Sequence, residues 1–266
     1  MYALSDDVVL IACGFAGLRA FSLNSKKFST PTVIMQVKNV FGVAYDLRTD
    51  TLLLLMPAVA SGSLTHYVYL LVSLHRKGTE WRQVQSLETN VSVSLSIKGA
   101  LDIAVCESHV LLGNGGKTLY VLDVNAEHQL SDAGSATLGE TFYALACTQR
   151  DGNTYVAFAQ ETSVSLQRLA SSPPRLEPLQ RWSNGLIAPR RLLFRGDQLF
   201  VADWHKETNL HAILLLRTSG VMSIAIKPQT DISVGAWALA GDRLVLWHRD
   251  INDVNSANSL YVCVFE

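Results

Sequence analysis

The stretch Trp237-Ala-Leu-Ala-Gly-Asp-Arg-Leu-Val-Leu-Trp247 contains two short apolar runs that are joined by a tight Gly-Asp turn. Short runs rich in Val, Leu and aromatic residues, bounded by Gly and Asp, are typical of two antiparallel β-strands in a hairpin. The same arrangement occurs near the N-terminus as Tyr2-Ala-Leu-Ser-Asp-Asp-Val-Val-Leu-Ile-Ala12. The chain therefore repeats one structural unit, and this repeat indicates its fold class.

Four further copies of the unit lie between these two, at 43–55, 103–112, 143–157 and 191–202. The second apolar residue after each turn serves as a reference position. These positions are Val9, Leu52, Val110, Tyr155, Leu199 and Leu244. Successive members are 43, 58, 45, 44 and 45 residues apart. The chain therefore contains six repeats, and the second repeat carries an insertion, which we expect in the charge-free segment 51–75.

Each repeat continues with a third apolar run and a weaker fourth one, and no stretch shows the period of an amphipathic helix. Four antiparallel strands in each repeat are typical of a β-propeller blade. The sequence thus predicts an all-β fold, a single propeller domain of about six four-stranded blades in which the last blade lacks its fourth strand. A seven-bladed ring and an open ring are the alternatives. The expected blades span residues 1–37, 40–88, 93–138, 141–182, 188–228 and 232–266.

The composition agrees with stacked sheets. Of the 266 residues, 48% are hydrophobic and 17% are charged, below the roughly 25% charged residues of an ordinary soluble domain. Blades that bury both faces of each sheet account for this deficit. Pro57 and the polar stretch 61–66 interrupt the charge-free segment, so we expect two strands and a loop there rather than a membrane span. The net charge of −1 provides no overall basic field for nucleic acid or an anionic membrane.

In repeat length and strand order the chain resembles the WD40-like propellers over essentially its whole length. It departs from their signature because no Gly-His dipeptide precedes a first strand and no Trp-Asp closes a third strand. Leu122-Asp123 is the nearest equivalent of the Trp-Asp pair. The resemblance supports the fold and does not select a subfamily.

The cysteines and histidines show no metal-binding spacing. Cys13, Cys106, Cys147 and Cys263 lie far apart, each in an apolar run, which favours buried thiols in a reducing compartment over disulfides. We therefore expect a cytoplasmic or nuclear protein. The seven histidines form neither an HxH nor an HExxH motif, so no cofactor and no metal are expected.

Two carboxylates lie where catalytic propellers place acidic residues, on the first strands near the axis. Asp46 and Asp102 are the only candidates there. Such a pair can bind a cation or act as an acid and a base, which would make the protein a hydrolase or lactonase-like enzyme with a metal on the axis. Aspartates at these positions more often accept backbone N–H bonds in turns. We therefore expect no catalytic residue.

The candidate partner-binding residues lie in loops and near the start of the fifth repeat. Two groups follow second strands, and an arginine cluster, Arg175 to Arg195, joins repeats four and five. Arginine recognises carboxylate and phosphate, so an accessory subunit that contacts nucleic acid through this cluster is a further alternative. The partner-binding residues we expect are Trp204, His205, Lys206, His248, Arg249, Asp250, Arg190 and Arg191.

The leading hypothesis is a non-catalytic scaffold, a subunit of a larger complex that binds other proteins and no membrane. Long loops at 56–66, 203–209 and 248–258 would provide one binding face. The sixth blade would provide an open edge, at which a partner could supply the missing strand. Such an edge would also result if the chain were excised from a longer one, or if the sixth blade tolerates three strands.

Overall fold

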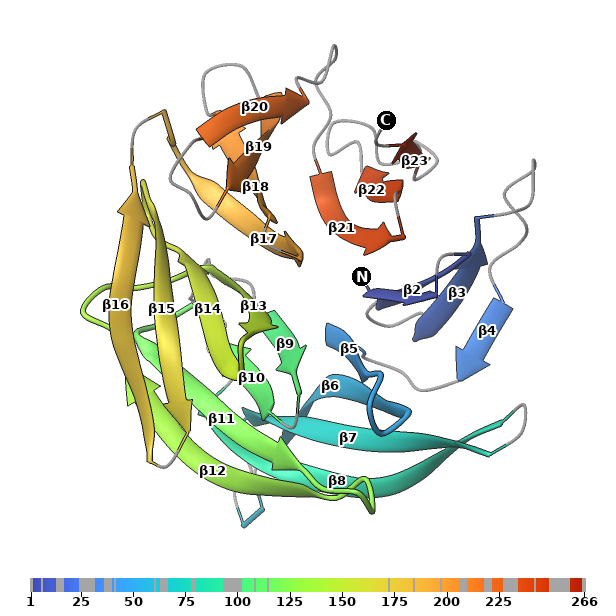
Figure 1. Cartoon of the computed structure of the whole chain (residues 1–266). Helices are drawn as coiled ribbons and strands as arrows, with labels where there is room; N and C mark the ends of the chain where they lie inside the picture. The colour runs from blue at the N-terminus through green and yellow to red at the C-terminus, as the bar shows by residue number, and fades with distance from the viewer. Residues whose placement is uncertain are drawn as a thin grey trace.

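In the computed structural model, the strands form six antiparallel sheets around a common centre (Figure 1). Five sheets have four strands, and the described part of the sixth has three. This confirms the predicted propeller, and we number the sheets as blades one to six in chain order. No helix in the described residues could cross a membrane. The structure describes residues 2–5, 7–12, 17–23, 32–35, 40, 42–59, 61–62, 67–77, 80–92, 102–107, 109–113, 115–171, 173–183, 185–196, 198–205, 210–217, 222–226, 234–241, 243–248 and 259–264.

Within each blade, strands that follow one another in the sequence pair antiparallel from the innermost to the outermost. Blades one to three comprise β1 Tyr2–Ser5, β2 Val8–Ala12, β3 Leu18–Ser22 and β4 Thr32–Met35; β5 Gly42–Asp46, β6 Thr51–Val59, β7 Tyr67–Lys77 and β8 Glu80–Ser92; and β9 Asp102–Cys106, β10 His109–Gly113, β11 Thr118–Val124 and β12 Leu130–Thr137. Blades four to six comprise β13 Ala144–Arg150, β14 Asn153–Ala159, β15 Val164–Ser171 and β16 Pro174–Trp182; β17 Pro189–Arg195, β18 Gln198–His205, β19 Leu210–Arg217 and β20 Met222–Ile226; and β21 Val234–Ala240, β22 Arg243–His248 and β23 Ser259–Val264.

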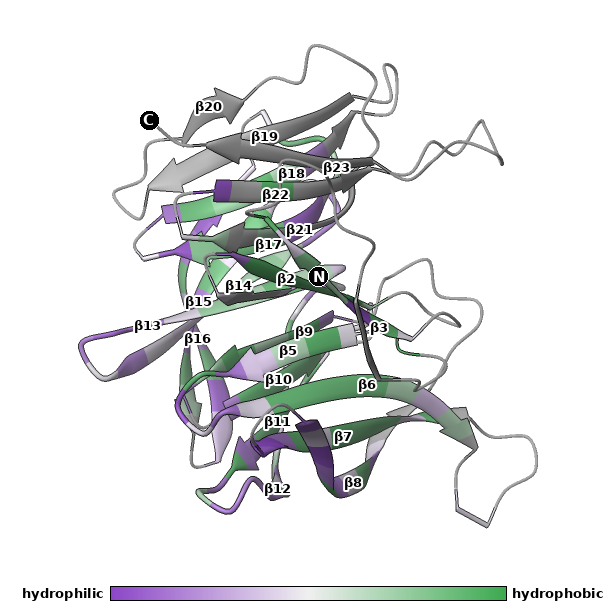
Figure 2. Cartoon of the chain, turned by 90° about the vertical axis from the view of Figure 1, so that its right-hand side faces the viewer, coloured by the Kyte–Doolittle hydropathy of each residue, from purple (hydrophilic) through white to green (hydrophobic). Residues whose placement is uncertain are grey.

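Both faces of a blade are buried against its neighbours. On β6, Leu52 and Leu54 belong to a cluster with blade one, whereas Leu53 and Leu55 belong to a cluster with blade three. Alternate residues of a strand point to opposite faces, so a continuous apolar run serves two interfaces at once. In Figure 2, β6 is green along most of its length, while purple gathers on the outermost strands β8 and β12.

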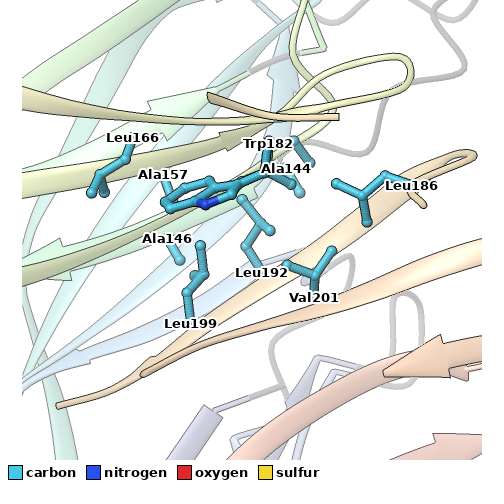
Figure 3. Packing of buried hydrophobic residues seen from close by; sticks show 11 residues of the cluster. Ala144, Ala146, Ala157, Leu166, Trp182, Leu186, Leu192, Leu199 and Val201 are labelled. Atoms are coloured by element: carbon cyan, nitrogen blue, oxygen red, sulfur yellow. The ribbon is translucent and has the colours of Figure 1, made fainter. Parts of the chain in front are cut away.

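A single tryptophan occupies the middle of one interface between blades. Figure 3 shows the Trp182 indole, at the end of β16, between Ala146 and Ala157 of blade four and Leu192 and Leu199 of blade five. Small residues on the inner strands of blade four leave room for this large ring. The indole N–H has no hydrogen-bond partner among the described groups, so the ring acts there through packing.

The interfaces continue around the whole ring. Each innermost strand contacts the next, and β21 contacts β1. Val9 and Ile11 of blade one share a buried cluster with Ala238, Ala240 and Val245 of blade six. Beside this cluster, Arg243 Nη2 donates to Asp7 Oδ1 at 2.8 Å. Side-chain packing between blades one and six therefore closes the six-bladed ring, so neither an open ring nor a seventh blade is present in the described part.

One reference position of the repeat is displaced by a residue. Val9, Leu52 and Val110 each pack against the preceding blade, but Tyr155 packs in the cluster that blade four shares with blade five. A shift of one residue along a strand moves a side chain to the other face. The structural equivalent in blade four is therefore a neighbour of Tyr155, and apolar residues on both faces of β14 hid this from the sequence pattern.

The loop predicted at 56–66 is shorter than expected, because β6 continues to Val59 and includes Pro57. β5 pairs with β6 only as far as Leu55, and Pro57 lies opposite Tyr69 of β7 alone. Proline lacks an N–H, which costs little where a strand has a neighbour on one side only. The insertion of the second repeat thus lengthens strands, and β8 extends to Ser92, past the expected blade boundary at 88.

Candidate interaction site at one end of the ring

The innermost strands begin at the same end of the ring. The Leu145 N–H of β13 donates to Asp102 Oδ2 of β9 at 3.0 Å, so the starts of these two strands lie side by side. The Arg190 guanidinium of β17 lies 4.2 Å from the centre of the Tyr143 ring, directly before β13. We call this end, marked by Asp102, Tyr143 and Arg190, the entry face, and the opposite end, where the innermost strands finish, the exit face.

The register of blade five places four of the expected partner-binding residues on the entry face. Pro189 at the start of β17 is paired with Asp203 near the end of β18. The last two residues of β18, Trp204 and His205, therefore lie at the same end as Arg190 and Arg191.

Blade six places His248 on the same face. β22 begins at Arg243, which is paired with Asp7 in the β1–β2 turn at the exit face, and ends at His248. Lys206, Arg249 and Asp250 lie outside the described residues. The sequence prediction that both second-strand ends reach one face of the ring therefore agrees with the strand register.

Strand pairing is irregular at the entry face of both blades. Pro189 is paired with Asp203 and Arg191 with Ala202, so Arg190 is an extra residue in β17. A similar irregularity lies between Val234 and Ala236 at the start of β21. Such β-bulges increase the local twist and change the direction of the bulged side chain. Here the bulge accompanies the stacking of Arg190 on Tyr143.

Arg190 is held in place without an ion pair to any described residue. Its guanidinium stacks on the half-buried Tyr143 ring, and its Nη1 donates to the Pro189 carbonyl oxygen at 2.9 Å. No carboxylate of the described residues lies within ion-pair distance of it. The backbone of Tyr143 is itself fixed, because its N–H donates to the Ala159 carbonyl oxygen at 2.7 Å. Stacking on an aromatic ring orients a guanidinium and leaves its edge available for ligands.

At the entry face, the charge of Arg191 affects the pKa of Asp102. The Asp102 carboxylate accepts the N–H groups of Leu145 at 3.0 Å and Ile103 at 3.1 Å. Burial raises the pKa of Asp102, and the positive charge of Arg191 opposes that shift. The two side chains form no ion pair, and Arg191 Nη1 donates to the Arg190 carbonyl oxygen at 3.3 Å. Arg191 therefore also lacks a close carboxylate partner in the described part of the chain.

Asp203 positions the arginine pair, and the sequence pattern did not reveal it. This carboxylate is 4% exposed and accepts the N–H of Ile187 at 3.0 Å and that of Ala188 at 2.7 Å. The loop that leads into β17 is thereby tied to the end of β18. A single Asp at the end of the apolar run Leu199–Ala202 is the signal that could have revealed it.

Replacing Asp203 with Ala is expected to lower the free energy of unfolding by about 2–3 kcal/mol, because two N–H groups of a tightly packed loop lose a charged acceptor. Urea unfolding followed by tryptophan fluorescence measures the change. Glu161→Ala, which removes an exposed carboxylate from the β14–β15 turn, is the control and should change stability by less than about 0.5 kcal/mol. Equal effects of the two variants would contradict the role given to Asp203.

The two candidate axial carboxylates are not brought together. Asp46 lies at the end of β5 on the exit face, whereas Asp102 begins β9 on the entry face. Along the strand direction, the end of β5 lies four residues beyond its start, which is roughly 13 Å at 3.3 Å per residue. Asp46 accepts the Arg48 N–H at 2.9 Å and the Thr49 hydroxyl at 2.6 Å, which confirms its interpretation as a turn residue. Across the described ranges, no group of three or more His, Cys, Asp or Glu side chains is arranged to hold a metal ion.

The exit face carries a histidine pair between blades two and three. The His75 and His128 rings stack with their centres 3.9 Å apart, and His128 Nδ1 is hydrogen-bonded to the Thr51 hydroxyl at 2.8 Å. Burial and the neighbouring His75 lower the pKa of His128. These side chains tie hairpin turns of neighbouring blades together, which is a structural role.

The arginine cluster of the sequence is divided in the structure. Arg175 and Arg181 lie on β16, the outermost strand of blade four, whereas Arg190, Arg191 and Arg195 lie on β17, the innermost strand of blade five. Arg181 is paired with Glu140 through two hydrogen bonds of 2.7 and 2.9 Å. The five arginines therefore do not form one continuous basic surface.

The two described thiols are free, as expected. Cys106 of blade three is buried, and the half-buried Cys147 of blade four packs in the cluster between blades three and four. Burial raises the pKa of the Cys147 thiol well above its ordinary value, and a hydrogen bond with Cys106 adds to the shift. Cys13 and the side chain of Cys263 lie outside the described part.

Comparison with known proteins shows the fold alone. No protein-family model and no curated protein matches the chain. A functionally unknown protein from Desulfotomaculum acetoxidans is similar in structure, with a TM-score of 0.62, 14% identity, and 99% of this chain and 88% of that chain covered. A nidogen/laminin complex matches with a TM-score of 0.58, 12% identity and coverage of 91% and 85%. A Lactobacillus plantarum protein matches with a TM-score of 0.54, 12% identity and coverage of 96% and 95%.

Proposed function

We propose that the chain is a non-catalytic, WD40-like interaction scaffold, a subunit of a larger complex, whose entry face at blades five and six binds another protein. The observation that carries this proposal is the Arg190 guanidinium, stacked on Tyr143 without a carboxylate partner in the described part. Arginine and tyrosine are enriched among the residues that contribute most to binding energy at protein interfaces. A ring closed by side-chain packing holds such a pair in a fixed position.

Neighbouring features of the entry face support the proposal. Ile187, in the loop before β17, is 40% exposed, and few large apolar side chains are so exposed in the described part. Trp204, His205 and His248 reach the same end of the ring. One of the similar structures was determined as a complex, that of nidogen with laminin. An apolar side chain surrounded by polar and charged groups is the usual arrangement of a protein-binding patch.

The proposal that the protein is not an enzyme is supported by the separation of Asp46 and Asp102, which cannot act together on one substrate. A metal analysis of the purified protein tests it. Less than a stoichiometric amount of any tightly held metal ion is expected. A tightly held ion at one equivalent would overturn the proposal in favour of a metal-dependent propeller enzyme.

The outer edge of blade six is a second contact that we propose. Among the described strands, β23 pairs with β22 only. The unpaired backbone groups of such an edge can accept a strand from a partner. This contact would act together with the entry face and would leave the arginine pair accessible.

Affinity capture from native extract tests the entry face. Three forms of the tagged chain are compared by quantitative mass spectrometry: the unaltered protein, an Arg190→Glu/Arg191→Glu variant, and an Arg175→Glu control. Arg175 is exposed on the outermost strand β16, so its reversal leaves the entry face unchanged. A partner retained by the unaltered chain and the control but lost from the double variant is expected. The proposal is wrong if all three capture the same proteins in equal amounts.

A further inference from the structure

We propose that the arginine pair of the entry face recognises carboxylates, so that the partner presents an acidic peptide segment to Arg190 and Arg191. This inference rests on the proposed function and names the chemistry of its partner.

Arg190 and Arg191 lie next to one another at the entry-face end of β17. Arg190 is the extra residue of the bulge, and regular pairing with β18 resumes at Arg191. The Arg190 guanidinium is fixed on the Tyr143 ring of blade four. Because both arginines lie at the very start of the strand, one ligand at this face can contact both of their long side chains.

Both guanidinium groups keep N–H donors that no described residue accepts. Among the described residues, Arg190 uses Nη1 for a backbone carbonyl and Arg191 does the same. The remaining N–H groups of a guanidinium form a planar set that matches the two oxygens of a carboxylate. Tyr143 restricts the motion of Arg190, which lowers the entropy lost on binding. Two such groups on neighbouring residues suit a segment with more than one Asp or Glu.

The arrangement of the arginines favours an acidic peptide over a nucleic acid. Nucleic-acid affinity depends on many phosphate contacts along a basic track. The other arginines near this part of the sequence do not extend the pair, because Arg175 and Arg181 lie on β16 and Arg181 is already paired with Glu140. Among the described residues, the entry face thus offers the two cationic groups of Arg190 and Arg191 rather than a track, which favours the peptide.

The test uses fluorescein-labelled hexaglutamate, a hexaglutamine peptide of equal length, and a single-stranded DNA hexamer as probes of the whole chain. Fluorescence anisotropy is measured at low and high salt. We expect hexaglutamate to bind about tenfold or more tightly than hexaglutamine, with an affinity that falls as salt rises. Arg190→Ala/Arg191→Ala should weaken hexaglutamate binding at least about tenfold, and Arg175→Ala should leave it unchanged. Unchanged melting temperatures show that the variants remain folded.

Three results would overturn the inference: equal binding of hexaglutamate and hexaglutamine, hexaglutamate binding that survives in the double variant, or tighter binding of the DNA than of hexaglutamate. The capture experiment separates this failure from failure of the proposed function. A protein partner lost from the double variant, together with no hexaglutamate binding, refutes the acidic ligand and leaves the interaction scaffold standing. Hexaglutamate bound at the arginines without any captured partner supports the ligand chemistry and contradicts the scaffold.

Discussion

Phe158→Ala is expected to lower the free energy of unfolding by about 3–5 kcal/mol. Phe158 of β14 is fully buried in the interface between blades three and four, and its ring lies edge-on to Phe142 with the centres 5.0 Å apart. Removing the ring leaves a cavity between two sheets whose spacing is set by all the other interfaces of the ring, so the neighbouring side chains can fill little of it. Equilibrium unfolding in urea measures the loss.

The matched control is Leu179→Ala. Leu179 is an apolar residue of the outermost strand β16 with 51% of its surface exposed, so its truncation should cost no more than about 0.5–1 kcal/mol. Similar losses for the two variants would mean that Phe158 does not lie between blades.

Val9→Asp is expected to destabilise the fold by several kcal/mol, because an unpaired carboxylate would be buried where the ring closes. Val9 is fully buried and packs with Ala238, Ala240 and Val245 of blade six. The first and last blades are covalently linked only through the other four, so disrupting their contact opens the ring. Thermal unfolding and limited proteolysis of blade six measure the effect.

Two further variants make this prediction specific. Val9→Ala keeps the position apolar and should cost about 1–3 kcal/mol through the cavity alone. Val84→Asp introduces the same charge on β8, where Val84 is 42% exposed, and should change stability by about 0.5 kcal/mol or less. The proposed ring closure fails if Val9→Asp is tolerated as well as Val84→Asp.

The repeat was predictable from sequence because its signals are local. Each hairpin turn lies between apolar runs a few residues long, and the second strand needs no distant partner to be recognised. The six reference positions all lie on second strands as a result. The face of the sheet to which a side chain points depends on the neighbouring blades, which a local pattern does not contain. The reference position predicted at Tyr155 is therefore one residue out of register. A loop was predicted at Pro57 because proline lacks an N–H. This lack disrupts a strand only where the strand has neighbours on both sides, and β6 has one neighbour at Pro57.

The candidate site was predictable only in part. The arginines could be predicted as binding residues because they cluster in the sequence. The order of the strands then predicted that Trp204 and His205 lie at the same end of the ring as Arg190. Sequence alone could not show that Tyr143, from the preceding blade, provides the ring on which Arg190 stacks. Sequence alone also could not distinguish Asp203, which accepts N–H groups of the loop before β17, from the other aspartates in turns. Both features depend on contacts between strands far apart in the chain.

The most direct test of the interaction scaffold is site-specific photo-crosslinking in native extract. A photoreactive phenylalanine replaces Ile187 at the entry face or, as the control, Val84 on the outermost strand β8; the two side chains are 40% and 42% exposed. We expect a discrete crosslinked protein from position 187, none from position 84, and loss of the first when Arg190→Glu/Arg191→Glu is added. A crosslink from position 84 alone, or one from position 187 that persists in the double variant, would contradict it.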